Sequence, residues 1–333
     1  MKVVLSAPSK TFLLGEYLVL KDSQALVLLT KPRFTLTATS KSSKQLEEVY
    51  LGVHPSSPAG RLYSQSSALK KWSLHFQDPH NGLGGFGASG AQFLLTYCLL
   101  QMIETGEWTD NDSNLGEWPH FVTEPGFLQK LWGAYQEFSD GGSGADILAQ
   151  LAGQITHVKL NPAETAVLNW PFHHYDFALV RTGQKVATHT HLKNLTSKNL
   201  SSKNLANLKT DQMLAAFELG YQALQSENIE NFTQSIFQYQ DALIEQNLVA
   251  AHTLEFVSAL RATDAVAAVK GCGALGADVL FVMYKKINSA IVKDRLDLLG
   301  LPIVATSENL CCGLKTKVDV PLNKRTSMRE AEL

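Results

Sequence analysis

A glycine-rich segment of this chain runs directly into an apolar helical stretch, and this junction limits the folds that the chain can adopt. Residues 80–90 read HNGLGGFGASG, and residues 90–107 read GAQFLLTYCLLQMIETGE. Ser89 lies near the helix start, where a hydroxyl is a favoured cap. Glycine lets the backbone approach an anion closely, and a helix N-terminus presents unpaired N–H groups. The segment suits a phosphate-binding loop, but for any one such turn taken alone a plain connecting turn is the favoured interpretation.

Two further glycine-containing turns occur along the chain. Residues 139–152 read SDGGSGADILAQLA, where glycine and serine again precede a helical run. Residues 270–284 read KGCGALGADVLFVMY, a turn followed by a strand. The P-loop pattern GxxxxGK followed by Ser or Thr is absent, as is a GxGxxG with an acidic residue at dinucleotide spacing. A phosphate is the obvious ligand for turns of this kind at helix starts.

The remaining pattern predicts an α+β protein, with strands dominating the first half of the chain and helices the second. Strands are predicted at 2–7, 11–20, 25–39, 153–160, 175–182 and 301–306. From 191 to about 270 the pattern is mostly helical, and the clearest helices are predicted at 212–226, 250–269 and 287–299. Residues 40–80 are polar and are interpreted as a variable excursion. A length of 333 residues fits two domains, placed at 1–170 and 171–333.

Composition excludes several classes of function. Charged residues make up 18% and the formal net charge is −2, so no global positive field attracts nucleic acid. No stretch approaches the roughly 18 apolar residues of a membrane span, and the N-terminal apolar run is too short for a signal peptide. Four scattered cysteines without CxxC spacing indicate a reducing compartment and no cysteine zinc site: Cys98, Cys272, Cys311 and Cys312. We therefore expect a soluble cytoplasmic protein.

Two charged residues each have a structural and a catalytic interpretation. Lys10 starts a strand in a region short of charge. It is either a solvated surface lysine or an ammonium that stabilises negative charge during phosphoryl transfer. Asp146 starts a helical run. It is either an acidic residue that the helix dipole favours there, or a base that accepts or orients a substrate hydroxyl proton. Beside Lys10 the carboxylate would stay ionised, because the opposite charge lowers its pKa.

The segment 181–195, RTGQKVATHTHLKNL, combines cations with threonine hydroxyls. A solvated loop is the default interpretation of this composition. The alternative is a contact with a phosphorylated substrate, since cations and hydroxyls suit phosphate oxygens. A metal site at His189 and His191 is less favoured, because no acidic or cysteine partner is close in sequence.

In order, these segments resemble the three motifs of the GHMP kinases. APSKTFLLGEYLVL (7–20) resembles the first motif, GFGASGA (85–91) the second and CGALGAD (272–278) the third. Within the family the resemblance is greatest to phosphomevalonate kinases, through Gly-Glu-Tyr at 15–17, SDGGSGAD at 139–146, Asp278 and the stretch 176–192. The resemblance covers most of the chain.

The resemblance implies a fold and a reaction. The fold would join an N-terminal ribosomal-S5-domain-2-like domain, with a left-handed βαβ crossover, to a ferredoxin-like C-terminal domain. The reaction would transfer the γ-phosphoryl group of ATP to 5-phosphomevalonate. Lys10, Ser89 and Asp146 would be catalytic, and Ser89 would help to place Mg²⁺. The resemblance implies that this chain would act on a small phosphorylated substrate, as a monomer or a homodimer, without nucleic acid or membrane as a partner.

The implied binding residues fall into two sets. The loop that would wrap the ATP phosphates comprises Gly85, Phe86, Gly87, Ala88, Ser89, Gly90 and Ala91. The substrate would contact Lys10, Tyr17, Ser143, Gly144, Thr188, His189, Thr190, Gly273 and Ala274.

The chain also departs from the family pattern. Ser9 replaces a glycine of the first motif, Ala88 a serine of the second, and Leu275 and Ala277 replace glycines of the third. Each added side chain restricts the backbone dihedral angles at its position and how closely the backbone can approach a ligand. Two alternatives therefore stay open. One is mevalonate kinase or another GHMP small-molecule kinase, in which Glu137 would hold Mg²⁺ opposite Ser89. The other is a GHMP-fold protein that binds a ligand without catalysis.

Overall fold

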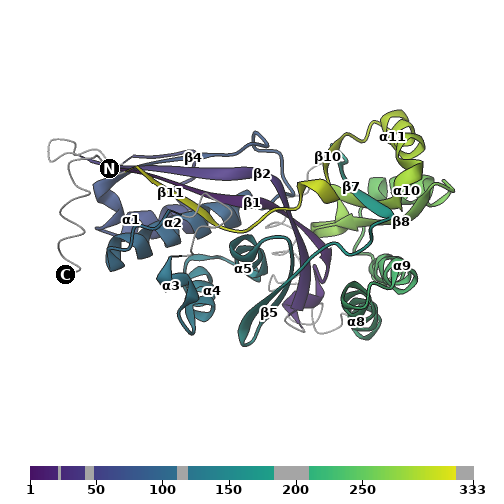
Figure 1. The fold of residues 1–333 in the computed structure, drawn as a ribbon, viewed down its shortest axis with the longest axis horizontal. Helices are drawn as coiled ribbons and strands as arrows, with labels where there is room; N and C mark the ends of the chain where they lie inside the picture. The colour runs from purple at the N-terminus through teal and green to yellow at the C-terminus, as the bar shows by residue number, and fades with distance from the viewer. Residues whose placement is uncertain (22–23, 42–48, 111–118, 184–209, 320–333) are drawn as a thin grey trace.

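The structure is a computed structural model that describes residues 1–21, 24–41, 49–110, 119–183 and 210–319. It contains two β-sheets that lie at opposite ends of an elongated molecule (Figure 1). The predicted α+β class is therefore confirmed. The described helices include none that is long and apolar enough to cross a membrane.

The first sheet is built around two long antiparallel strands, β1 (Lys2–Leu14) and β2 (Gln24–Ser40). Strand β11 (Lys315–Asp319) pairs with the other edge of β1. The other edge of β2 is shared by β5 (Ile155–Leu160) and β4 (Trp72–Gln77). The outer strands are β6 (Ala163–Leu168), beside β5, and β3 (Tyr50–Leu51), which pairs in parallel with β4.

Helices cover the sheet on the side that carries the glycine-rich loop. Helix α2 (Ala88–Thr105) and helix α5 (Ala145–Ala152) pack against β1 and β2. Most residues of α2 are buried, which explains why its sequence is apolar on nearly all sides. The other helices of this half are α1 (Pro58–Gln65), α3 (His120–Thr123) and α4 (Phe127–Phe138).

The second sheet has the strand order β10-β7-β9-β8, with every neighbouring pair antiparallel. Its strands are β7 (Tyr175–Arg181), β8 (Val266–Cys272), β9 (Val279–Lys285) and β10 (Ile303–Thr306). Its helices are α8 (Asp211–Gln225), α9 (Ile229–Glu245), α10 (Ala251–Arg261) and α11 (Ser289–Leu298). This order is that of a ferredoxin-like βαββαβ unit, as the resemblance implied.

The second sheet buries both of its faces. Along β7, Phe177 and Leu179 join the core shared with α8 and α9, whereas Ala178 and Val180 pack with residues of α10 and α11. This is the alternation expected of a strand. The first core cluster includes buried residues of both sheets. The predicted division at residue 170 falls between β6 and β7 and stays a prediction.

Three sequence predictions were wrong. The strand predicted at 11–20 ends at Leu14, and Leu18–Leu20 form a 3-10 turn, because Gly15 with φ 99° turns the chain out of the strand. Residues 40–80 contain α1 and β4, and along β4 buried and more exposed side chains alternate, a short strand signal. The helix predicted at 250–269 ends at Arg261, and β8 begins at Val266. The residues there pair with β9, so tertiary pairing outweighs the helical preference of the alanines, and the valines suit the strand. Short 3-10 turns occur at Leu18–Leu20, Leu69–Lys71, Ala274–Gly276, Lys286–Asn288 and Ser307–Asn309.

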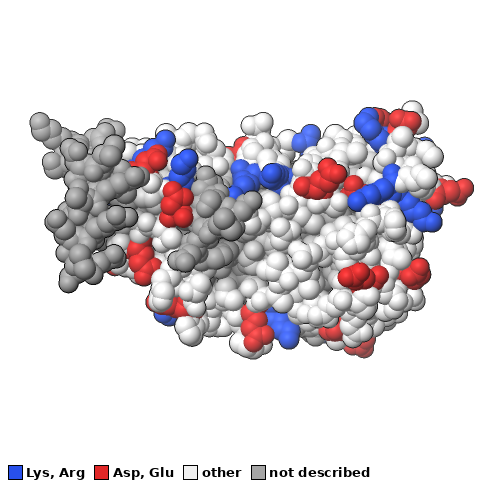
Figure 2. All heavy atoms as spheres, in the orientation of Figure 1, with Lys and Arg blue, Asp and Glu red and all other residues white. Residues whose placement is uncertain are grey.

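The described surface carries charges of both signs. On the face shown in Figure 2, Lys and Arg side chains are interspersed with Asp and Glu, and the described atoms form no continuous basic area there. This distribution agrees with the small formal net charge of −2.

Candidate active site

The N-termini of α2 and α5 meet beside strand β1. Each helix is preceded by a glycine in the left-handed region, Gly87 with φ 84° and Gly144 with φ 77°. A Cβ atom on Gly90, in the first turn of α2, would lie 2.9 Å from both Asp146 Oδ2 and Gln150 Oε1. Only glycine therefore allows this approach, and it brings the Asp146 carboxylate against the residue next to Ser89.

Lys10 runs along the glycine-rich loop. Its backbone N–H donates to the Phe86 carbonyl at 2.9 Å. A Cβ atom on Gly87 would lie 2.5 Å from Lys10 Cγ and 2.9 Å from its Cε, so the loop packs on the lysine side chain. The structure thus brings the three predicted catalytic residues, Lys10, Ser89 and Asp146, to one place. Their catalytic roles remain predictions.

Gln150 is a site residue that sequence reasoning missed. Its side chain is fully buried, and its Nε2 donates to the Pro8 carbonyl at 2.8 Å and to the Gly87 carbonyl at 3.3 Å. It ties the first-motif strand to the glycine-rich loop. The available signal was its position four residues after Asp146, which places both on one face of α5.

The third glycine-containing turn also reaches the loop. A Cβ atom on Gly85 would lie 2.7 Å from the Cβ of Asp278. Thr182, just after β7, holds this turn from the other side, since its N–H donates to the Asp278 carbonyl at 3.2 Å and its hydroxyl to the Ala277 carbonyl. The predicted ligand Gly273 has φ 82° and open space around it, and Ala274 begins the 3-10 turn. All three glycine turns therefore converge.

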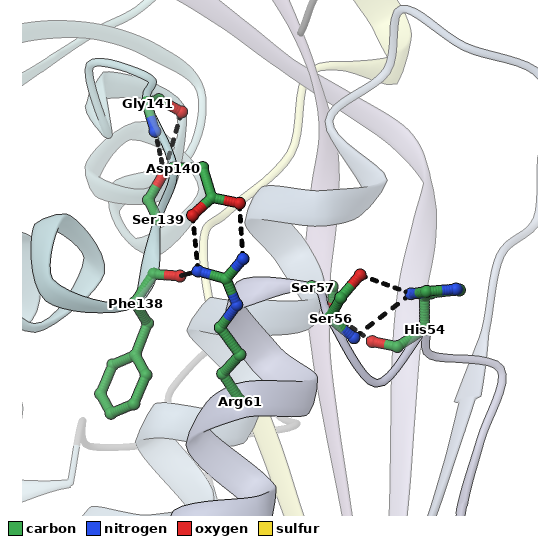
Figure 3. Close-up of polar contacts among 8 residues, drawn as sticks. All are labelled: His54, Ser56, Ser57, Arg61, Phe138, Ser139, Asp140 and Gly141. Carbon is green, nitrogen blue, oxygen red and sulfur yellow. Dashed lines mark hydrogen bonds and ion pairs between the residues drawn. The ribbon is translucent and has the colours of Figure 1, made fainter.

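The loop before α5 is held by several side chains. Trp132 Nε1 donates to the Ser143 carbonyl at 2.8 Å. Arg61 of α1 forms a two-pronged ion pair with Asp140, with Nη1 2.7 Å from Oδ1, and its Nη1 also reaches the Phe138 carbonyl at 3.2 Å (Figure 3). The predicted substrate residue Ser143 is thus placed by contacts from α1 and α4. Gly144 follows it and packs against Trp132.

Ser9, which replaces a motif glycine, and Phe86 of the glycine-rich loop contact the same side chain. The His80 ring stacks on Phe86 at a centroid distance of 4.1 Å, and its Nε2 lies 2.6 Å from the Ser9 hydroxyl. Ser9 donates to the Pro32 carbonyl at 2.6 Å, so the Nε2–H of His80 donates to Ser9. Burial lowers the pKa of His80, and nearby Arg181 adds to this while Asp78 opposes it. Ser9 and Phe86 thus form one packed unit with a neutral imidazole.

Tyr17 is buried, and its hydroxyl accepts a hydrogen bond from the Leu275 N–H at 2.8 Å. Its predicted role in substrate binding remains a prediction. Three other predicted substrate residues, Thr188, His189 and Thr190, lie outside the described residues. Glu137, considered for the alternative reaction, is exposed on α4.

The donor set suits a magnesium ion shared with a bound nucleotide. The Asp146 carboxylate lies against Gly90, the residue that follows Ser89 in the first turn of α2. Within the described ranges, no group of three or more His, Cys, Asp and Glu side chains is placed to hold a metal ion alone. Mg²⁺ commonly takes one or two protein ligands and completes its shell with water and substrate phosphates. Ser89 and Asp146 fit that pattern.

Two cavities in the described part of the chain lie elsewhere. One, of 510 Å³, follows α9 and is lined by residues that include Tyr175, Phe237 and Asp241. The other, of 320 Å³, lies between β5, β6 and α8 and includes His157 and Glu218. Neither is lined by the glycine-rich loop, so the convergence of the three turns, and not a cavity, identifies the candidate site.

Comparison with known proteins gives a fold and no sequence relative. No protein-family model and no curated protein matches the sequence. Among solved structures, the Lin0012 protein from Listeria innocua matches with a TM-score of 0.70 and 15% identity, over 96% of this chain and 100% of that one.

Two further matches are enzymes. The phosphomevalonate kinase of Streptococcus pneumoniae, in complex with phosphomevalonate and AMPPNP, has a TM-score of 0.65 and 14% identity over 91% of this chain and 98% of that one. The mevalonate kinase of Methanococcus jannaschii has a TM-score of 0.61 and 12% identity over 91% and 97%. The neighbours that are named as enzymes are GHMP kinases, and at these identities they show that this chain has the GHMP kinase fold.

Proposed function

We propose that this GHMP-fold chain is an ATP-dependent small-molecule kinase and that its acceptor is 5-phosphomevalonate. The observation that carries the proposal is the packing of the glycine-rich loop on Lys10 and Asp146, through Gly87 and Gly90. This packing gathers backbone N–H groups, a cation and a carboxylate at the meeting point of two helix N-termini. Such a site suits phosphate groups and the charge that develops when one is transferred.

Each residue has a proposed task. The loop 85–91 would hold the ATP phosphates with backbone N–H groups, and the Lys10 ammonium would neutralise charge at the transferred group. Ser89 and Asp146 would hold Mg²⁺, which supplies charge neutralisation between the phosphates when bound. Gln150 and the Phe86 carbonyl fix the loop and the Lys10 strand relative to each other. Catalysis would rest on positioning, because phosphoryl transfer needs little covalent chemistry from the protein.

The choice of acceptor rests on the sequence motifs and on the structural likeness to a kinase complexed with phosphomevalonate. A phosphate acceptor already carries negative charge and needs no strong base. Asp146 would then orient Lys10 and not remove a proton. A hydroxyl acceptor such as mevalonate would need Asp146 as the base.

The alternative of a binding protein without catalysis is less favoured. Lys10, Ser89 and Asp146 are all present, and the altered third turn still packs on the loop through Asp278 and Gly85.

The proposed compartment is the cytoplasm, since the four cysteines are unpaired in the structure.

A coupled ADP-release assay with Mg-ATP tests the proposal, with 5-phosphomevalonate and mevalonate supplied separately. Turnover on 5-phosphomevalonate alone supports it, turnover on mevalonate alone moves the chain to the neighbouring kinase, and silence on both with ATP bound refutes both acceptors. Asp146→Asn should reduce kcat by about 10²-fold or more, as expected when a positioning charge is lost from such a site. Asp294→Asn, on the exposed side of α11, is the matched control and should leave kcat unchanged.

A further inference from the structure

A buried ion pair joins the two halves of the molecule. Glu16 follows β1 in the first sheet, and Lys270 lies in β8 of the second. Their side chains are 3% and 0% exposed, and Lys270 Nζ donates to Glu16 Oε1. Lys270 also donates to the Gly271 carbonyl at 2.6 Å. This contact therefore fixes the position of β8 against the end of the first-motif strand.

Burial and charge act in opposite directions on this pair. Burial raises the pKa of Glu16, and the charge of Lys270 and its hydrogen bond oppose that rise, with Lys10 adding a smaller opposing effect. A buried pair gives little net stability, but removing one partner leaves an uncompensated charge. Helix α9 supports the arrangement, because Gln240 Oε1 accepts the Gly271 N–H at 2.8 Å and the Tyr239 ring centroid lies 5.4 Å from Lys270 Nζ.

A second contact joins the same two segments, between Tyr17, the residue after Glu16, and Leu275, which lies beyond the end of β8. Leu275, in the third turn, has φ 54° and ψ 15°, a left-handed conformation that is costly for a leucine. Its N–H donates to the buried Tyr17 hydroxyl at 2.8 Å, and its carbonyl accepts from the Ala250 N–H at 2.9 Å. Non-glycine residues keep such conformations only where their surroundings determine them. The hydrogen bond from Tyr17, just after β1, helps to hold Leu275 in this conformation.

We propose that Glu16 and Tyr17 act as a clamp that fixes the third turn, residues 273–278, against the glycine-rich loop before any nucleotide binds. The clamp consists of the Glu16–Lys270 and Tyr17–Leu275 contacts. The turn that it holds ends at Asp278, whose Cβ limits the space beside Gly85. Glu16 and Tyr17 are therefore positioning residues, and only their effect on turnover rests on the proposed kinase function.

The first test is amide hydrogen exchange of the ligand-free protein, resolved to the peptide that contains Leu275. Tyr17→Phe removes the acceptor and should speed exchange there by about tenfold, the effect of losing one ordinary hydrogen bond. Tyr63→Phe is the matched control, since Tyr63 is also buried and its hydroxyl donates to the Trp72 carbonyl at 3.3 Å. Unchanged exchange at Leu275 in Tyr17→Phe, relative to this control, overturns the clamp.

A second pair of variants separates position from stability. Glu16→Gln and Lys270→Met should each lower Tm, whereas the double variant should recover most of Tm, because no buried charge is left unpaired. The clamp predicts that the double variant still exchanges faster at 273–278. In the kinase assay, Tyr17→Phe should lower kcat by about tenfold with the KM for ATP within about twofold, since preorganisation acts on the transition state.

The outcomes distinguish the two proposals. A wild-type chain without turnover on either acceptor refutes the proposed function, and the exchange comparison still decides the clamp. A double variant that recovers Tm, exchange and kcat together shows that the pair is only structural and overturns its positioning role.

Discussion

Adding one methyl group at Gly90 should lower the activity of this protein with little effect on its stability. In Gly90→Ala the new Cβ would lie 2.9 Å from Asp146 Oδ2 and from Gln150 Oε1, whereas ordinary contacts begin at 3.4 Å. Both side chains must therefore move by about 0.5 Å, the difference between those two distances. A misplacement of about 1 Å can cost 10²-fold in rate, so we expect kcat to fall by about tenfold.

The same substitution should cost little stability. Alanine in a helix is favoured over glycine by about 1 kcal/mol, and overpacking of a core costs about 1–3 kcal/mol. These estimates leave a net loss of about 0–2 kcal/mol in the free energy of unfolding. Urea unfolding gives this quantity, and the ADP-release assay gives kcat.

Gly133→Ala is the control. Gly133 lies in α4, is exposed, and a Cβ there meets no atom within 4 Å. It should raise stability by about 1 kcal/mol and leave kcat unchanged. Wild-type kcat in Gly90→Ala would refute the view that the position of Asp146 controls turnover.

Two more predictions follow from buried polar groups. The buried Thr11 hydroxyl makes no hydrogen bond in the described structure, so Thr11→Val should raise the free energy of unfolding by about 1 kcal/mol in a urea titration; a loss of stability would contradict the assigned environment. The pKa of His80 is lowered on folding, so the unfolded chain binds more protons and stability falls as pH drops below about 6.5. His80→Gln should flatten the dependence of Tm on pH between pH 8 and 5, apart from a similar contribution by His157, and an unchanged slope would show that His80 does not titrate on unfolding.

Much of the fold could be predicted from local sequence. The strands at β1, β2, β5, β7 and β10 follow β-branched and apolar runs bounded by turn residues, and α2 follows its glycine-rich start. Strand β8 could not be predicted, because its alanines continue the helical pattern of the preceding residues and only pairing with β9 distinguishes it as a strand. Strand β11 returns to β1 across almost the whole chain, a pairing that no local pattern indicates.

Some residues of the candidate site could likewise be predicted from local sequence, and others could not. Lys10, Ser89 and Asp146 could be selected because their motifs are local in sequence and resemble those of a known family. Gln150 and His80 could not, because their roles depend on hydrogen bonds and stacking between segments far apart in the chain. Contacts of this kind are set by the packing of α5 and the loop on β1, which the motifs do not specify.

The pairing of β11 with β1 also determines how late in synthesis the first sheet can form completely. The strand that carries Lys10 gains its second neighbour only when residues 315–319 have left the ribosome, since Lys2 pairs with Asp319 and Ser6 with Lys315. Arg33 secures this return by donating to the carbonyls of Ser6 and Cys312 at 2.8 and 2.7 Å. Until then β1 presents an open edge, the kind of surface on which unfinished chains associate. The open edge of β1 is therefore covered only after β11, the last described strand, has been synthesised.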